Sequence, residues 1–232
     1  MAALSGPLIA ELVRAGTLVI DPFRPERVGP NSYNLEITRD VVMYEKGARV
    51  HDAFEAWWYE WEPTAAVCGP VIADRVCPPP RVVAVPLKVT EEEPTVLRQL
   101  PDGLDPDDQD GHGQVYRFWP GVLYLLCTAE YTETPYPYRP QIDGRSSIGR
   151  LGEFVHVTAG YGDVNFKGQW TLEVAVVQAI ETYWPLQSCQ ISYTTVEGPQ
   201  QDYESKKYQG QRGPRASRLF MEIQRERAKH TA

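Results

Sequence analysis

The amino-acid sequence predicts a mainly β domain whose short strands form a barrel or a sandwich. Its 20 prolines and 18 glycines interrupt the 232-residue chain so often that long helices have little room. Runs of β-branched and aromatic residues recur between these breaks, as is typical of short strands. The expected strands are Leu18–Ile20, Ser32–Thr38, Val41–Tyr44, Val82–Val89, Val122–Tyr131, Phe154–Val157, Trp170–Val177 and Ser188–Thr195.

Two helices are expected, one near each end of the chain. The first covers Pro7–Ala15, where apolar residues recur at helical spacing and Gly16 provides a stop. The second covers Ala216–Lys229, where apolar residues alternate with Arg and Glu pairs and indicate an amphipathic tail. Between them, the acidic, turn-rich segment 101–113 is expected to be a solvated loop.

Composition and charge exclude several classes of protein. The chain has 23 Lys and Arg against 31 Asp and Glu, a formal charge of −8, so it has no general basic surface for a nucleic-acid polymer. An anionic ligand must therefore meet a local basic pocket. The longest apolar run, Val122–Cys127, is far shorter than the about 20 residues that span a bilayer. With no secretory signal pattern at its start, the chain is expected to be cytoplasmic.

Cysteines and histidines do not indicate a metal site. Cys68, Cys77, Cys127 and Cys189 are too scattered for a disulfide framework, and no pair has C-x-x-C spacing. The four histidines form neither an H-E-x-x-H nor an H-x-E motif. We therefore expect reduced thiols and no metal held by the protein itself.

The densest group of polar functional residues lies between 143 and 173. Gly144, Arg145, Ser146 and Ser147 combine a flexible backbone, a planar guanidinium and two hydroxyls, which are groups that bind a phosphate chain. Arg150 could reinforce that site or hold a carboxylate. A surface turn with ion pairs explains the same residues equally well.

Two carboxylates follow this segment. Asp163 lies in a glycine-rich turn, whereas Glu173 lies within an apolar run that is typical of a strand. Because a carboxylate inside an apolar strand is costly unless it is paired or used, Glu173 is a candidate functional residue. Period-two alternation puts Glu173 and Thr171 on one face of the strand. An edge strand with Glu173 facing water is the alternative.

A basic segment near the C-terminus forms a third group. Residues 206–215 contain Lys207, Tyr208 and Arg212 among glycines and glutamines. In an acidic protein this segment could close over a polyphosphate, with Tyr208 stacking or packing. A solvated basic tail is the alternative.

Together these groups resemble the dCTP deaminase branch of the trimeric dUTPase superfamily. The matching motifs are LVIDPFRPERVGPNSYNLEI (18–37), GRSSIGRLG (144–152), the segment from His156 to Glu173 with its HVTAG and FKGQWTLE elements, and KYQGQRGP with the following SR (207–218). The resemblance implies a distorted β-barrel or jelly roll with a short N-terminal helix and a C-terminal arm at about 200–232. It implies one domain over residues 1–232, with a non-matching insertion at about 50–115.

The resemblance also implies an activity. The chain would deaminate dCTP to dUTP, and the T-A-G after His156 resembles bifunctional members that continue to dUMP and pyrophosphate, supplying deoxyuridine nucleotides for thymidylate synthesis. The motifs of zinc-type deaminases are absent from the sequence. Glu173 would serve as the general acid and base, while Ser146 and Arg150 would orient the water and stabilise charge.

Nucleotide binding is implied at further positions. Arg145 and Ser147 would contact the triphosphate, Asp163 the deoxyribose 3′-hydroxyl, and arm residues the phosphates, with Mg²⁺ entering on the nucleotide. The family builds its sites between subunits, which implies a homotrimer. The remaining expected contacts are main-chain groups at Ala159, Trp170, Thr171 and Leu172 for the base, and Lys207, Tyr208 and Gln211 from the arm.

Some residues depart from the family pattern. Asn34 replaces an Asp, Gln187 replaces an Arg, and the usual arm tyrosine has only Tyr203 as a nearby candidate. Gly162 stands where the pattern usually has Ile, and the smaller residue could loosen specificity at the sugar pocket or admit a larger ligand. Two alternatives stay open: a pyrophosphatase acting on dUTP or another dNTP, with Asp163 positioning the water, and a non-catalytic nucleotide-binding trimer.

Overall fold

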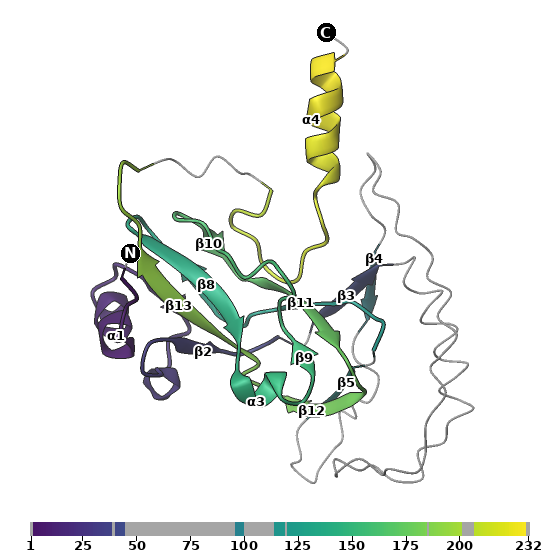
Figure 1. The fold of residues 1–232 in the computed structure, drawn as a ribbon, viewed down its shortest axis with the longest axis horizontal. Helices are drawn as coiled ribbons and strands as arrows, with labels where there is room; N and C mark the ends of the chain where they lie inside the picture. Colours follow the sequence, from purple (N-terminus) through teal and green to yellow (C-terminus); the bar gives the residue numbers. More distant parts are fainter. Residues whose placement is uncertain are drawn as a thin grey trace, which may run out of the picture.

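Antiparallel strands make up most of the computed structural model, which describes residues 2–38, 40–44, 96–99, 114–118, 120–184, 186–200 and 207–230 (Figure 1). The prediction of a mainly β domain is confirmed. Within the described residues the strands form four sheets rather than one closed barrel. The expected strand Val82–Val89, the loop 101–113 and most of the 50–115 insertion lie outside the described residues.

The sheets have orders β1-β7-β10, β4-β3-β6-β11-β9, β12-β5 and β2-β13-β8. Helical elements are α1 (Gly6–Arg14), η1 (Pro25–Arg27), α3 (Ser146–Gly149) and α4 (Phe220–His230). Strands are β1 (Val19–Asp21), β2 (Tyr33–Leu35), β3 (Val41–Tyr44), β4 (Val96–Gln99), β5 (Gln114–Phe118), β6 (Tyr124–Cys127), β7 (Tyr131–Glu133), β8 (Tyr138–Gly144), β9 (Glu153–Phe154), β10 (Lys167–Gly168), β11 (Thr171–Val176), β12 (Ile180–Trp184) and β13 (Cys189–Thr195).

Helix α1 forms where the sequence predicts it, because its end signals are local. The Ser5 side chain accepts a hydrogen bond from the Leu8 N–H, and a proline lies in the first turn. Gly16 follows the helix with a φ of 72°, which favours glycine and ends the helix. Ile9 and Ala10 face the core.

Two sheets carry the segments of interest. In the five-stranded sheet, every residue of β6 is buried, and β6 pairs with β11 and, through a single residue pair, with β3. In the β2-β13-β8 sheet, β13 alternates between core-facing and half-buried residues. Strand β8 lies at the edge of that sheet and leads directly into α3 (Figure 1).

Several strand expectations need correction: β4, β5, β10 and β12 were not expected, and β2 and β9 are shorter than or shifted from the expected ranges. The expected strand Val122–Tyr131 is broken into β6 and β7, because the intervening turn sends Glu130 into a buried ion cluster. Strand β8 was not expected, since Pro140 lies in its middle. A proline is tolerated there because β8 is an edge strand, where a missing N–H leaves no ladder bond unmade.

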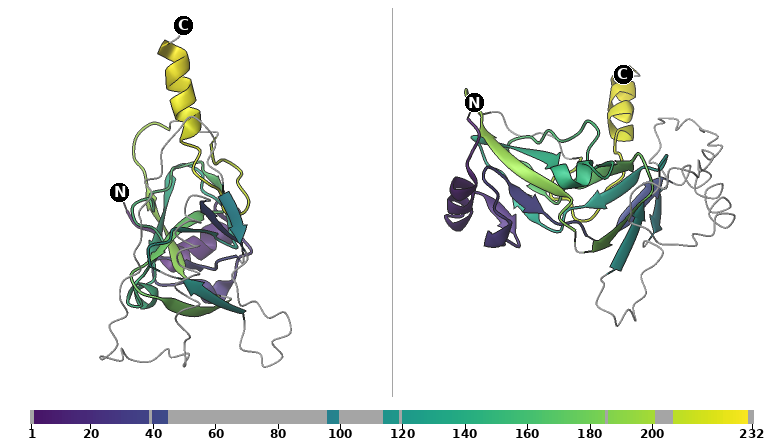
Figure 2. Two further views of the ribbon diagram at one scale, coloured as in Figure 1. Left: turned by 90° about the vertical axis from the view of Figure 1, so that its right-hand side faces the viewer. Right: turned by 60° about the horizontal axis from the view of Figure 1, so that its bottom comes forward.

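The C-terminal helix begins later than the sequence predicts. Helix α4 starts at Phe220 rather than Ala216, because the preceding residues belong to an extended arm that packs on the sheets. From here on, "the arm" means residues 207–218, the part of the expected C-terminal arm that is described and precedes α4. Figures 1 and 2 show α4 rising away from the strands. Among the described helices, none has the length and apolar character to cross a membrane.

Candidate active site

Glu173 lies on β11, between β6 and β9 in the five-stranded sheet. It shares the more open face of the strand with Thr171, as predicted, while Leu172 and Val174 face the core. Its carboxylate oxygen Oε2 contacts Nδ1 of His156. The His156 side chain is 6% exposed and the Glu173 side chain 34% exposed. A buried ring therefore holds one oxygen of a carboxylate that still reaches solvent.

This contact follows from the pairing of β9 with β11. Phe154 stands opposite Ala175 in the antiparallel register. The same register places His156, two residues after Phe154, opposite Glu173, two residues before Ala175. Side chains opposite each other on paired strands meet. His156 had no predicted role of its own. The His156–Glu173 contact depends on the register between β9 and β11, and a register cannot be read from the sequence of either strand alone.

The GRSS motif forms a short helix rather than a flexible turn. Helix α3 is preceded by Arg145 as its N-cap residue and followed by Arg150 as its C-cap residue. Ile148 is buried beneath the helix and fixes this turn of chain on the core. Ser146, Ser147 and Arg150 are exposed. The motif thus presents its hydroxyls and one guanidinium on the surface.

Arg145 is held by the segment before β13. Its main-chain N–H donates to the Ser188 carbonyl at 3.3 Å, and its Nη1 donates to the Gln187 carbonyl at 2.9 Å. The main chain of Gln187, the residue that replaces a family arginine, therefore orients Arg145. Since a guanidinium has five N–H donors, others are left for an anionic ligand.

Glu173 and the α3 side chains are not joined in this single chain. Within the described residues, no hydrogen bond links Glu173 to Ser146 or Arg150, although α3 contacts β9 and β9 pairs with β11. The structure therefore places the three predicted catalytic residues on neighbouring elements without assembling them.

The packing at Gly162 leaves no room for a side chain beside the expected sugar site. Asp163 and Ala159 are exposed in the loop before β10, and Gly162 lies buried beside Asp163. A Cβ at position 162 would lie 2.5 Å from Cη2 of Trp170 and 2.7 Å from Cγ of Pro140. The Trp170 indole therefore occupies the space that the missing side chain would have left.

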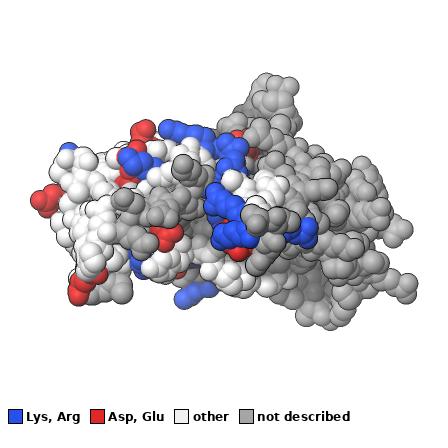
Figure 3. Space-filling view, turned by 90° about the horizontal axis from the view of Figure 1, so that it is seen from above, with Lys and Arg blue, Asp and Glu red and all other residues white. Residues whose placement is uncertain are grey.

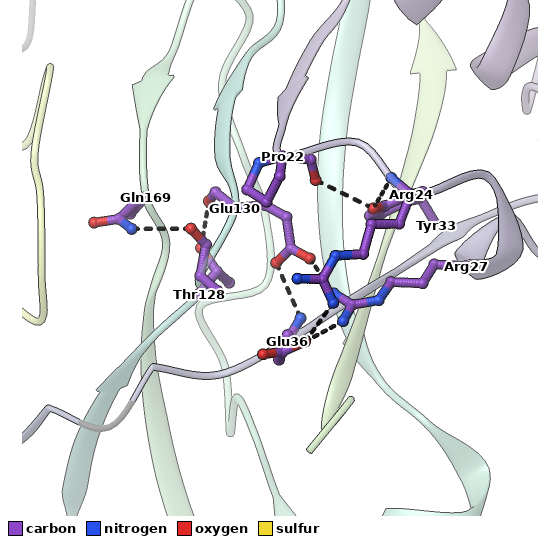
Figure 4. Close-up of polar contacts among 9 residues, drawn as sticks. Pro22, Arg24, Arg27, Tyr33, Glu36, Thr128, Glu130 and Gln169 are labelled. Carbon is purple, nitrogen blue, oxygen red and sulfur yellow. Dashed lines mark hydrogen bonds and ion pairs between the residues drawn. The ribbon is translucent and has the colours of Figure 1, made fainter. Parts of the chain in front are cut away.

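The segment before Glu173 is fixed by the turn between β6 and β7. The Thr128 N–H donates to the Trp170 carbonyl and the Thr128 Oγ1 accepts from the Trp170 N–H, both at 2.9 Å. Gln169 Nε2 donates to the Ala129 carbonyl at 3.1 Å. Figure 4 shows Thr128 beside Gln169, with Glu130 on the other side of the turn. The main-chain groups expected to meet the base are thus anchored at their first residue.

Glu130 belongs to a buried ion cluster with Arg27 and Glu36 (Figure 4). Arg27 Nη1 lies 2.6 Å from Glu130 Oε1, its Nη2 contacts Glu36, and the Glu36 N–H donates to Glu130 Oε2 at 3.0 Å. Burial raises the pKa of Glu130, and hydrogen bonds together with the charge of Arg27 work against that shift. Sequence reasoning missed this cluster, because 103 residues separate Arg27 from Glu130.

A further carboxyl group is buried without such partners. Glu153 on β9 is 2% exposed and has no cationic partner within the described part of the chain; the Ser188 hydroxyl lies near enough to work against the effect of burial on its pKa, although no hydrogen bond of standard geometry joins the two. Burial raises the pKa of Glu153 to about 7. It stands opposite Val176, whose side chain faces the core, so it lies on the opposite face of the sheet from Glu173.

The arm lies along β10 and the start of β11 of its own chain. Gln211 forms a parallel bridge with Gly168, and the Gln169 N–H donates to the Gln211 carbonyl at 3.1 Å. Gln211 Nε2 donates to the Gln169 carbonyl at 2.6 Å, and the Arg215 N–H donates to Thr171 Oγ1 at 3.1 Å. The arm therefore reaches the face of β11 that carries Glu173.

The other predicted arm residues are engaged within the arm and α4. Lys207 Nζ contacts Glu222 on α4 and lies 5.8 Å from the ring centroid of Tyr208. The Tyr208 hydroxyl accepts a hydrogen bond from the Arg218 N–H at 2.9 Å. Tyr208 thus packs in the arm, which is one of the two roles considered for it.

Basic side chains gather on the face from which α4 rises. Figure 3 shows Lys and Arg in a band across this face, where the arm and α4 lie. Arg212, Arg215 and Lys167 are exposed, and the Arg212 guanidinium stacks 4.2 Å above the Tyr131 ring. An acidic chain therefore carries a local basic surface next to the Glu173 face. No group of three or more His, Cys, Asp or Glu in the described ranges is arranged to hold a metal ion.

Comparison with known proteins identifies the family. A family model described as dCTP deaminase-like matches residues 88–196. A dUMP-forming dCTP deaminase of Leptospira biflexa is 34% identical over 215 residues, which cover 92% of this chain and 95% of the relative. The chain belongs to the dCTP deaminase family. Another family member, a dUMP-forming dCTP deaminase of Cytophaga hutchinsonii, is 36% identical over 208 residues, or 90% of this chain and 91% of its own.

A solved structure of a family protein is also similar. The 2′-deoxycytidine 5′-triphosphate deaminase from Agrobacterium tumefaciens is 14% identical with a TM-score of 0.49, over 84% of this chain and 48% of that one. Family membership confirms the resemblance inferred from the four motifs. The roles of the individual deaminase-family residues, including Glu173, Ser146 and Arg150, stay predictions.

Proposed function

We propose that the chain is a dUMP-forming dCTP deaminase. The observation that carries this proposal is the His156–Glu173 pair on the open face of β11, in a chain that is 34% identical to a relative with that name over almost its whole length. Neither a pyrophosphatase without deaminase activity nor a non-catalytic nucleotide-binding trimer has support of this kind.

The pair fits the chemistry of hydrolytic deamination. Glu173 takes a proton from water as the oxygen bonds to C4 of cytosine, and later gives a proton to the departing amine, so that ammonia leaves and uracil remains. A His156 ring with its proton on Nδ1 donates to Oε2 of Glu173, so that Oε1 is the oxygen that takes the proton from water. A carboxylate held at one oxygen and 34% exposed meets both requirements.

The second half of the reaction uses the triphosphate. A second water attacks the α-phosphorus of dUTP, the bond to the bridging oxygen breaks, and dUMP and pyrophosphate leave. Arg145 and Ser147 bind the triphosphate on α3, while Lys207 and Gln211 approach it from the arm. Mg²⁺ enters with the nucleotide and neutralises its phosphates, since hard oxygen ligands of the triphosphate suit it.

A homotrimer is part of this proposal. Four large apolar side chains around β9 are exposed to about half their surface or more: Leu151, Phe154, Val157 and Val177. Such a patch on a soluble-type fold favours burial against another copy. In a trimer, Ser146 and Arg150 of one subunit would complete the site around Glu173 of its neighbour, which explains why a single chain leaves them apart.

A reducing, cytoplasmic setting completes the proposal. Cys127 and Cys189 are free thiols buried in the fold, and burial raises the pKa of Cys127 to about 12. Free, unreactive thiols are typical of a reducing compartment.

A product assay tests the function directly. The purified protein is incubated with dCTP or with dUTP plus Mg²⁺, and ammonia, pyrophosphate and the nucleotide product are followed separately. The expected result is ammonia, pyrophosphate and dUMP from dCTP, without accumulation of free dUTP. Pyrophosphate from dUTP with no ammonia from dCTP would instead establish a pyrophosphatase. No turnover of either nucleotide, with binding retained, would contradict an enzymatic role.

A further inference from the structure

We propose that Trp170 is a positioning residue whose indole, packed against Gly162, sets the place of the Asp163 carboxylate and so determines selectivity for the sugar 3′-hydroxyl. This inference rests on the proposed function, because it requires a deoxynucleotide whose sugar lies at Asp163.

The segment that carries Asp163 runs in close contact with β8. The Ile142 N–H donates to the Gly160 carbonyl at 2.8 Å, and the Gly162 N–H donates to the Pro140 carbonyl at 3.1 Å. Gly162 has no room for a side chain, since its Cβ would lie 2.9 Å from the Pro140 carbonyl oxygen and nearer still to the indole. One side of the segment is therefore fixed by the edge strand.

The indole fixes the other side. Trp170 is 8% exposed, its Nε1–H donates to Thr132 Oγ1 at 2.9 Å, and its rings pack at 4.6 Å against the ring of Phe166. Its Cη2 is the atom nearest to the position that a Cβ on Gly162 would take, at 2.5 Å. The Trp170 indole, which is held by a buried hydrogen bond, thus packs directly against Gly162, the residue that precedes Asp163.

The contact between the small Gly162 and the large Trp170 belongs to a place where this chain departs from the family pattern. That pattern usually has Ile at position 162, whereas here the side chain that fills this space comes from Trp170. Because protein interiors are closely packed, replacing the indole by a smaller side chain leaves space into which the Gly162–Asp163 segment can sink. The Asp163 carboxylate is then displaced from the position in which it hydrogen-bonds to the 3′-hydroxyl of the sugar.

One residue thereby links two parts of nucleotide recognition. The main chain of Trp170 begins the segment expected to meet the base, and its side chain supports the turn expected to meet the sugar. Trp170 also stands three positions before Glu173 on the same stretch of chain. A misplaced sugar turn should therefore affect binding of the hydroxyl more than the chemical step at the base.

The experiment compares dCTP with 2′,3′-dideoxycytidine triphosphate, which lacks the 3′-hydroxyl. Ammonia release is measured for the wild type, Trp170→Phe and Trp170→Ile. A hydrogen bond to a charged group makes the wild type prefer dCTP in kcat/KM by about tenfold or more. Trp170→Ile is expected to lose most of this preference, mainly through KM for dCTP, and Trp170→Phe, which keeps an aromatic ring beside Gly162, to lose less.

A milder variant guards against failure of Trp170→Ile to fold. Thr132→Val keeps the indole but removes its hydrogen-bond acceptor, and it should reduce the preference in the same direction by a smaller factor. Equal losses for both nucleotides in Trp170→Ile, or an unchanged preference for dCTP in a folded Trp170→Ile, would overturn the proposal. A wild type that releases no ammonia from dCTP would instead contradict the proposed function.

Discussion

Glu130 and Glu173 are both carboxylates of the strand framework, but they differ in what holds them. Both oxygens of Glu130 have partners, one in Arg27 and one in the Glu36 N–H, and the side chain is fully buried. Glu173 has one partner, His156, and an open side. Complete pairing in the core fixes a group in place, whereas a single partner and access to water allow a carboxylate to exchange a proton.

The largest effect is expected at the open carboxylate. Glu173→Gln keeps the shape but removes the base, so ammonia release from dCTP should fall by about 10³-fold. The dissociation constant of dCTP, measured by isothermal titration calorimetry, should change little. Glu133→Gln is the matched control, because Glu133 pairs with Lys167 at 2.8 Å on another sheet, and it should retain activity. Loss of dCTP binding in Glu173→Gln would show that Glu173 is structural.

Breaking the buried ion cluster should act on stability instead. Arg27→Met leaves the buried Glu130 without its cation and Glu36 with only the more distant Arg24, and it should lower the free energy of unfolding by about 3–5 kcal/mol, measured by urea denaturation. Arg24→Met provides the control. Arg24 is half exposed and lies 3.5 Å from Glu36, so its loss should cost less than about 1 kcal/mol. Equal effects of the two variants would refute the distinction between them.

Glu153 is an intermediate case, because it is buried like Glu130 but has no cationic partner among the described residues. Since its pKa is raised from 4.5 to about 7, the folded state binds the proton more tightly than the unfolded state. The stability that this proton provides is fully present below about pH 4.5 and is lost as the pH rises through about 7, by up to about 3 kcal/mol.

Unfolding measurements between pH 4.5 and 8 test this sign. Glu153→Gln cannot titrate, so the wild type should lose stability relative to Glu153→Gln as the pH rises. A constant difference between the two proteins across this range would mean that Glu153 has an ordinary pKa.

The smallest effect is expected at the single partner of Glu173. His156→Ala removes the donor to Oε2 and should lower kcat by about tenfold, with a shift in the pH profile of kcat/KM. His156→Asn places an amide N–H where Nδ1 was and should recover part of the rate. An unchanged pH profile in His156→Ala would show that the ring only fills space.

Local sequence signals predicted much of this molecule and nothing that depends on distant pairing. Helix α1 and the face of Glu173 were predicted, because caps and period-two alternation involve neighbouring residues. His156 was missed, since its role comes from the register of two strands. The ion cluster was missed for the same reason, because Arg27 and Glu130 are far apart in the chain.

The packing around Gly162 could not be predicted for a related reason. A small residue in a sequence indicates empty space only if its neighbours in three dimensions are known. The neighbour that fills the space, Trp170, was assigned to base recognition through its main chain, and its side chain was left out of account. The effect of glycine at position 162 can therefore be judged only together with Trp170, which fills the space beside it.

The parallel bridge between Gly168 and Gln211 makes the arm behave as a short added strand. Its hydrogen bonds end on Gln169, which directly precedes the expected base-reading segment, and on Thr171, which lies within it. A base that fits poorly would disturb the edge on which the arm lies. Cleavage of the arm by trypsin at Arg212 or Arg215 should then be slower with a base that fits well than with one that fits poorly, without any label or turnover.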